Sequence, residues 1–169
     1  ETDIVGNIVF TQSGTTHVSA EGDEEMVNNL IIKVEGNTLK LSKKKDLKRI
    51  FGNRKATKLT VRISSPNLNQ LESDGVGNVT LDGPVKIESL HIESDGVGNI
   101  TASQLDCRHL TVDSDGVGNI RLKGNGGFAE YKSDGVGNID ARDFAAEDVT
   151  VRLSGVGSIK CYASNSIDL

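Results

Sequence analysis

The sequence predicts an all-β protein: a single-stranded β-helix, or β-solenoid, of about 20-residue coils with an irregular β N-terminal cap. Three observations predict it: a recurring hexapeptide, apolar columns spaced by two residues, and a turn-rich composition with 19 glycines and 4% aromatic residues. At 169 residues the chain fits one domain that can bury a core. We expect residues 1–63 to form the cap and residues 64–169 the solenoid.

The hexapeptide SDGVGN occurs four times, and a degenerate copy, SGVGS, follows at Ser154–Ser158. The full copies begin at Ser73, Ser94, Ser114 and Ser133. Their first glycines, with that of the degenerate copy, are separated by 21, 20, 19 and 20 residues. A period near twenty without a helical pattern predicts one repeat per coil.

Apolar residues recur at fixed distances from the first glycine of each repeat. The columns four and six residues after it are Val79, Ile100, Ile120, Ile139 and Ile159, and Leu81, Ala102, Leu122, Ala141 and Cys161. Matching columns lie four and six residues before it. Apolar residues two apart form one face of a strand, so we expect these columns to stack about 4.8 Å apart as the core. Cys107 and Cys161 then read as small buried or half-buried residues, without a mutual disulfide or a zinc site.

The first sixty residues lack the full hexapeptide and predict a different β arrangement. Asn28–Lys44 reads as two strands around a Glu-Gly-Asn turn, and Lys58–Leu68 as a strand that leads into the first full coil. The segment EGDEEMVNNL before them predicts one short helical turn. Such a segment would cover the unpaired strand edges at one end, whereas the final SNSIDL shows no comparable cap.

The hexapeptide itself admits two conformations. A continued strand would point its serine and both glycines inward, and its Asp, Val and Asn outward. A corner would use glycine at positive φ, with Asp and Asn side chains bonded to nearby backbone amides. The corner is favoured because two glycines in five residues weaken a plain strand. Either conformation stacks the Asp, Val and Asn side chains in columns.

The Asp and Asn columns are the candidate ligand-binding residues. They are Asp74, Asp95, Asp115, Asp134, Asn78, Asn99, Asn119 and Asn138. The Asn column is expected to be chiefly an amide ladder. Stacked carboxylates repel by about 1 kcal/mol in water and about 3–4 kcal/mol at an effective dielectric of 20, so they must fan into solvent, accept backbone N–H groups or bind a cation. Calcium takes carboxylate ligands, but the calcium-binding solenoid repeat has a period of about nine. Amide-bonded Asp turns are therefore favoured, and no metal or cofactor is expected.

The formal charge of −5 is unevenly distributed. Residues 1–64 carry a net +3 and residues 65–169 a net −8. The basic excess lies in Lys43–Lys58, for which a solvated loop is favoured over an anion site. The acidic second half argues against nucleic acid as a partner. No apolar run is long enough to span a membrane. No signal peptide is recognisable in the sequence. The chain begins abruptly at Glu1, which predicts a processed or trimmed N-terminus.

A strand ending in SSPNLNQLE, followed by repeated Gly-x-Gly-Asn-Ile units, resembles the bacterial family named putative auto-transporter adhesin, head GIN domain. The Gly-Asn-Ile parts of these units are Gly98–Ile100, Gly118–Ile120 and Gly137–Ile139. The opening segment VSAEGDEEMVNNLIIKVEGNTLKLS is also similar to that family. The resemblance covers nearly the whole chain and implies a β-helical fold, and export to the periplasm, outer membrane or cell surface. It brings no functional residues, and the fifth unit departs from it by losing both Asp and Asn.

The leading functional hypothesis is a non-catalytic binding or adhesion module that presents its repetitive face to an extended glycan or a protein surface. A polysaccharide-acting enzyme is the second hypothesis, but the repeated Asp residues are equivalent, and His17, His91 and His109 have no partner at a telling spacing. A third is an assembly component, a homo-oligomer joined by strand edges or by an outward valine column. That column is Val76, Val97, Val117, Val136 and Val156. Nucleotide binding is set aside because GVGNI lacks the third glycine of that motif.

Overall fold

The computed structural model describes residues 1–44 and 58–169, so most of the basic run Lys43–Lys58 lies outside the described residues. The predicted all-β solenoid is confirmed, with about five coils of roughly 20 residues. The N-terminal elements are β1 (Thr2–Asp3), β2 (Asn7–Gln12), β3 (His17–Gly22), α1 (Glu24–Asn29), β4 (Leu30–Glu35), β5 (Thr38–Lys43) and β6 (Leu59–Ser65). No helix among the described residues is long and apolar enough to cross a membrane.

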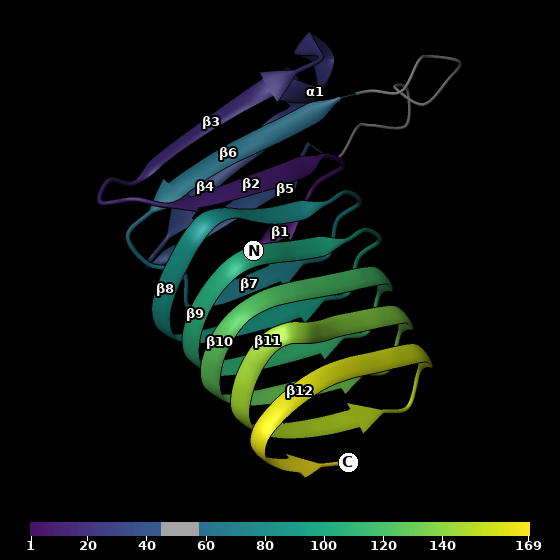
Figure 1. The fold of residues 1–169 in the computed structure, drawn as a ribbon. Coiled ribbons are helices and arrows are strands. Elements are labelled where there is room, and N and C mark those ends of the chain that lie inside the picture. The colour runs from purple at the N-terminus through teal and green to yellow at the C-terminus, as the bar shows by residue number, and fades with distance from the viewer. Residues whose placement is uncertain (45–57) are drawn as a thin grey trace.

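The coils are formed by one short strand and five long ones that pair in parallel, each with the next (Figure 1). They are β7 (Gln70–Ser73), β8 (Val79–Ser94), β9 (Ile100–Ser114), β10 (Val117–Ser133), β11 (Val136–Leu153) and β12 (Val156–Asp168). The residue four after the first glycine keeps one register throughout, which runs Val79, Ile100, Ile120, Ile139 and Ile159. The twenty-residue period therefore equals one turn of the chain around the core.

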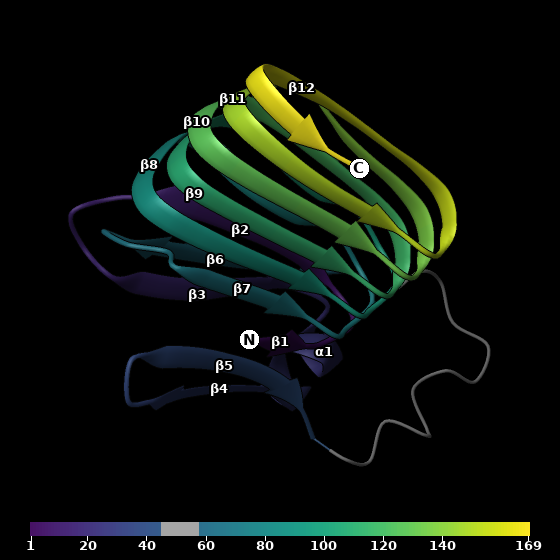
Figure 2. The same cartoon turned by 90° about the horizontal axis from the view of Figure 1, so that it is seen from below.

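Each long strand bends as it winds around the core (Figure 2). In β9 the buried residues are Ile100, Ala102, Leu105, Cys107, Leu110 and Val112. Their spacing alternates between two, as in a flat strand, and three, where the chain turns a corner. The hexapeptide makes the remaining turn, so a coil consists of three short walls. We call the walls first, second and third in chain order from the hexapeptide.

The predicted apolar columns form the part of the core behind the first and third walls, and residues that were not predicted, such as Phe144, fill it behind the second wall. Most members of the columns are at most 2% exposed; at the two ends, Asn69 is exposed and Val151 is only partly buried. Cys107 is buried, Cys161 is half-buried, and both are free thiols as expected. Burial raises the pKa of the Cys107 thiol, which keeps it protonated at neutral pH.

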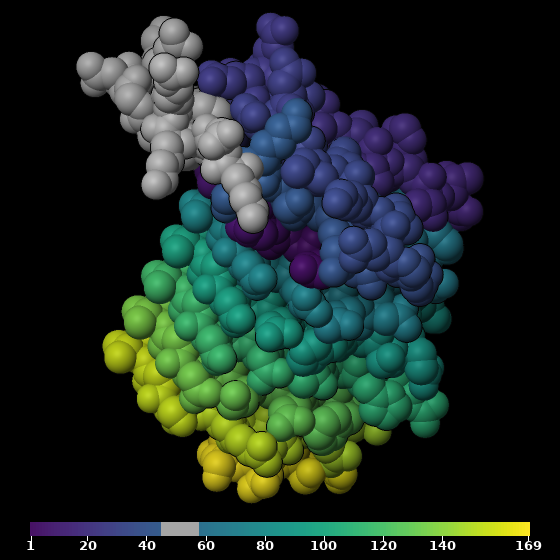
Figure 3. Space-filling model, turned by 180° about the vertical axis from the view of Figure 1, so that it is seen from behind, coloured from purple at the N-terminus to yellow at the C-terminus, as the bar shows by residue number. Residues whose placement is uncertain are grey.

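The N-terminal segment contains the predicted elements and also contributes to the solenoid. The antiparallel hairpin β4–β5, the helical turn α1 and the strand β6 all form where expected. In addition, β2 pairs in parallel with β8, and β1 with β7. Residues 2–10 therefore make an incomplete coil ahead of the first hexapeptide, and the boundary expected between residues 63 and 64 falls inside β6. Figure 3 shows the N-terminal elements at one end of the stack and the last coil at the other.

Candidate functional site

The hexapeptide bends the chain while its side chains still alternate between inside and outside. In each copy the first glycine is largely buried and the following valine and asparagine are exposed or partly so. The second glycine has a positive φ, for example +155° at Gly98 and +156° at Gly118. A Cβ at Gly118 would contact the carbonyl oxygen of Gly98 in the preceding coil. The glycines are therefore needed for the close approach of neighbouring coils, and the corner and alternation hypotheses both hold in part.

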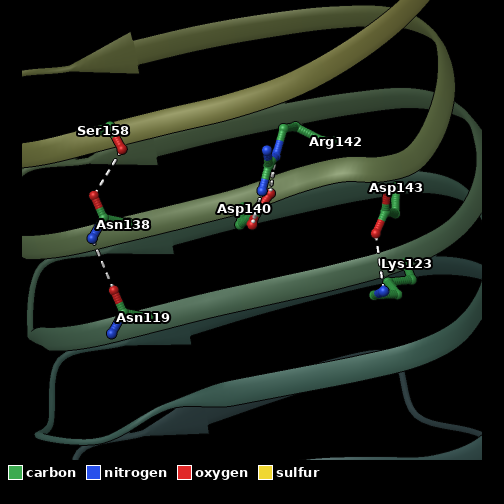
Figure 4. Close-up of polar contacts among 7 residues, drawn as sticks. All are labelled: Asn119, Lys123, Asn138, Asp140, Arg142, Asp143 and Ser158. Carbon is green, nitrogen blue, oxygen red and sulfur yellow. Dashed lines mark hydrogen bonds and ion pairs between the residues drawn. The ribbon is translucent and has the colours of Figure 1, made fainter.

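The asparagines form the predicted amide ladder along the solenoid. The Nδ2 group of Asn99 donates to Oδ1 of Asn78 at 3.0 Å, and that of Asn119 donates to Oδ1 of Asn99 at 3.2 Å. Asn138 continues the ladder, and the Ser158 hydroxyl ends it by donating to Asn138 Oδ1 at 2.7 Å (Figure 4). The backbone N–H of Asn99 also donates to Asn78 Oδ1, at 3.1 Å. Because an N–H requires an acceptor, this bond fixes which amide atom is the oxygen.

The ladder leaves one hydrogen-bond donor unused on each interior rung. A side-chain amide has two N–H groups, and one of them donates to the preceding rung. The oxygens of Asn78 and Asn99 each accept two bonds, from the backbone and from the side chain of the next coil. The second N–H of each rung has no partner within the ladder. The column therefore presents a row of N–H donors, about 4.8 Å apart.

The ladder begins earlier in the chain than the hexapeptide. The backbone N–H of Asn78 donates to Oδ1 of Asn7 at 3.0 Å, and Val5 forms a parallel bridge with Val76. The short sequence Val5–Ile8, VGNI, matches the second half of the repeat. Sequence reasoning missed this copy because its first glycine position holds Ile4, whose backbone lies against Gly75.

The aspartates do not form a comparable ladder. The backbone N–H groups of Asp95 and Gly96 both donate to the carbonyl oxygen of Ser73, at 3.0 and 2.9 Å, and later coils repeat this pattern. The expectation that the carboxylates accept the amides of the turn is therefore wrong, because carbonyl oxygens already accept them. The four Asp side chains are exposed to solvent. No group of three metal-ligating His, Cys, Asp or Glu side chains occurs within residues 1–44 and 58–169.

The two ends of the Asp column differ in charge environment. Partial desolvation, followed by repulsion from Asp95 and other nearby carboxylates, raises the pKa of Asp74. At the other end, a hydrogen bond from Lys132 lowers the pKa of Asp134, and the Lys132 Nζ lies 3.0 Å from its carboxylate. The carboxylate at the cap end therefore lies near other carboxylates, whereas the one at the far end lies beside a lysine.

A groove of about 670 Å³ follows the Asn ladder on the first wall of the coils. Its polar lining is Asn78, Thr80, Asn99, Thr101, Asn119, Arg121, Asn138, Asp140, Ser158 and Lys160. All four predicted asparagines line it, and none of the four predicted aspartates does. Sequence reasoning missed the column two residues after each Asn, which runs from Thr80 to Lys160. Strand alternation places that column on the outer face, and this was the signal that could have found it.

The missed column divides the groove into a neutral and a charged half. Thr80, Thr101, Arg121, Asp140 and Lys160 stack in register on successive coils. Arg142 donates twice to Asp140, with both distances 2.8 Å, and these bonds hold the pKa of that carboxyl well below its usual range (Figure 4). Arg121 and Lys160 make no ion pair with any described residue. The half of the groove near the cap therefore offers amides and hydroxyls, and the far half offers two cations.

The valine column separates the Asp and Asn columns. Val76, Val97, Val117 and Val136 are each about half exposed, and isolated parallel bridges join the first three. They form the outward apolar column that was expected if these valines faced solvent.

A capped β-solenoid with stacked Gly-x-Gly-Asn turns and a polar groove defines the class of this protein. The chain belongs to the putative auto-transporter adhesin, head GIN domain family, whose sequence model matches residues 5–169. This confirms the resemblance seen in the sequence.

Solved structures agree with the family. The chain is similar to a putative adhesin from Bacteroides fragilis, with 41% identity, 98% of this chain and 75% of that chain covered, and a TM-score of 0.90. A putative lipid binding protein from Parabacteroides distasonis shares the fold at 21% identity, with 99% and 87% covered and a TM-score of 0.67. A putative adhesin from Parabacteroides merdae shares it at 21% identity, with 94% and 73% covered and a TM-score of 0.62. Comparison with the curated proteins gives no match.

Proposed function

We propose that this protein is a non-catalytic binding module, exported to the bacterial cell envelope, that holds an extended glycan in the groove beside the Asn ladder. The observation that carries the proposal is the row of unused amide N–H donors, one per coil, along a polar groove. The family description and the similar putative adhesin from Bacteroides fragilis support a binding role at a surface.

A glycan fits the chemistry of the groove. Its hydroxyl and ring oxygens accept hydrogen bonds and recur along the chain, as the donors do along the ladder at about 4.8 Å. The hydroxyls of Thr80 and Thr101 add groups that both donate and accept. Arg121 and Lys160 suit a ligand with carboxylate or sulfate groups toward the far end. A protein surface is the alternative ligand that the sequence predicts.

The groove lacks the usual arrangement for glycoside hydrolysis. Such enzymes use two carboxyl groups, one of which is protonated and donates to the leaving oxygen. Asp140 is the one carboxylate among the described residues that line the groove, and its bonds to Arg142 keep it ionised. His91 lies 3.8 Å from Glu93 and 3.9 Å from Asp113, on the third wall rather than in the groove. These observations favour binding over catalysis.

The test is an array of host glycans and bacterial polysaccharides, probed with and without calcium. We expect saturable retention, and about tenfold or greater weakening in the double variant Thr101→Val/Arg121→Ala, which removes two hydrogen-bonding groups from the groove. The matched control is Asp95→Asn/Asp115→Asn, which changes two repeat residues outside the groove. Binding lost in the control and kept in the groove variant would place the site on the Asp column. A blank array would refute a glycan ligand.

A further inference from the structure

The last coil leaves one end of the solenoid open. Its inward residues Ile159 and Cys161 are only half-buried and Ile167 is 50% exposed, whereas Ile139 and Val149, one coil earlier, are 1% and 2% exposed. No strand among residues 1–44 and 58–169 pairs with the outer edge of β12. The opposite end carries α1 and the N-terminal strands (Figures 1 and 3). Among the residues that the structure describes, one end of the solenoid is therefore covered and the other is not.

An open strand edge of this kind invites pairing. It offers a row of unpaired N–H and C=O groups, and natural proteins cover such edges or place charges along them. The 13 residues of β12 contain only two charged side chains, Lys160 and Asp168. Beside them lie exposed Val156 and Tyr162, which are 71% and 52% exposed. This edge has the composition of an interface rather than of a protected edge.

We propose that β12 pairs with β12 of a second copy of this chain, which gives an end-to-end dimer with twofold symmetry. A twofold axis across the coil places the first wall of one copy on the third wall of the other, with the strands antiparallel. Such an interface uses the same surface on both copies and must be self-complementary.

The sequence of β12 is self-complementary in one antiparallel register. When Lys160 lies opposite Asp168 of the copy, Ile159 lies opposite Leu169 and Cys161 opposite Ile167. In this register inward-facing residues of one copy pair with inward-facing residues of the other, because Cys161 and Ile167 continue the inward columns of Ala141 and Val149. A shift by two residues also preserves this alternation but sets Lys160 against a serine. Opposite charges therefore select the register.

The dimer has a consequence that rests on the proposed glycan-binding function. Each groove lies on a first wall, and the axis turns the first wall of the copy to the opposite side. The two grooves would thus face away from each other, and one dimer could link two polymer chains or bind one surface more tightly through avidity.

Cysteine pairing tests the register. Under mild oxidation Ile167→Cys should give a disulfide-linked dimer through Cys161 of the other copy, while the wild-type chain should not, because its two Cys161 residues lie several positions apart. The matched control Asp168→Cys points its thiol to the other side of the strand and should not link. A dimer that links equally in both variants, or in neither, would overturn the proposed pairing.

Charge exchange tests the interface independently, with mass measured by sedimentation equilibrium up to millimolar protein. The wild-type chain should dimerise, and Lys160→Asp or Asp168→Lys alone should weaken the dimer about tenfold, since two attractive pairs become repulsive. A 1:1 mixture of the two variants should restore a dimer, because the mixed pair has complementary charges. A wild-type chain that stays monomeric throughout, or variants whose mixture does no better than either alone, would overturn the proposal.

Discussion

The Asn and Asp columns come from the same hexapeptide, repeat at the same interval and are both exposed, yet they behave differently. An amide donates and accepts, so one asparagine can bond to the next along the axis. An ionised carboxylate only accepts hydrogen bonds, so one aspartate side chain cannot bond to the next. The backbone N–H groups of the aspartates donate to serine carbonyl oxygens. A repeated polar residue thus supports the stack only when its chemistry lets it bond to its own copy. The groove lies beside the bonded column.

The largest effect should come from the glycine that supports both columns. Gly118→Ala would put a Cβ against the carbonyl oxygen of Gly98 at a φ of +156°, so we expect a loss of about 3 kcal/mol or more in the free energy of unfolding. Urea denaturation measures it. Gly14→Ala is the control, because a Cβ added there would meet no other part of the protein within 4 Å beyond its chain neighbours, and it should change stability little. Equal effects of the two substitutions would contradict close coil contact at the second glycine.

Removing a side chain from the Asn column should lower the stability of the protein more than removing one from the Asp column. Asn99→Ala removes three hydrogen bonds of the ladder and should cost about 1–2 kcal/mol, with exposure to water reducing the loss. Asp95→Ala in the same coil should stay within about 0.5 kcal/mol of the wild type. The pair is compared by urea midpoints at one pH. A larger loss for Asp95→Ala would reverse the proposed roles.

A smaller effect should distinguish the ends of the Asp column. The folded-state pKa of Asp74 is raised, so ionisation there opposes folding, and Asp74→Asn should stabilise the protein slightly at pH 7. The pKa of Asp134 is lowered, so its ionised form favours folding, and Asp134→Asn should destabilise slightly. Both differences should shrink as the pH falls through about 4 and vanish where the carboxyls are protonated in both states. Thermal midpoints from pH 3 to 7 measure them, and shifts of the same sign in the two variants would refute the contrast.

The coils could be predicted because apolar side chains recur at the same distance from the first glycine of each repeat. A buried column accepts few residues other than apolar ones. The cap hairpin and strand β6 followed from local turn and strand patterns. The coil contributed by Val5–Ile8 could not be predicted in this way, because a long insertion separates it from the next repeat and Ile4 replaces its glycine.

The candidate site could be predicted only in part. The asparagines were found because they repeat, and the ladder they were expected to form is present. The residues of the column from Thr80 to Lys160 occupy the same position in each coil but differ in chemistry, so no repeated residue type marks the column. Such variation is possible because a side chain that lines an open groove is less restricted in size and polarity than one in the core. The aspartates repeat as regularly but lie outside the groove, so their role as ligands remains a prediction without geometric support.

The unused N–H groups of the Asn ladder are proposed to line a ligand site. The most direct test is an NMR titration, with a glycan retained on the array, that follows the side-chain amide signals of Asn78, Asn99 and Asn119 and the backbone signals of Asp95 and Asp115. Saturable shifts of the asparagine side-chain signals, with the aspartate signals unmoved, are the predicted result. Shifts confined to the aspartate turns would contradict the claim and move the site to the other column.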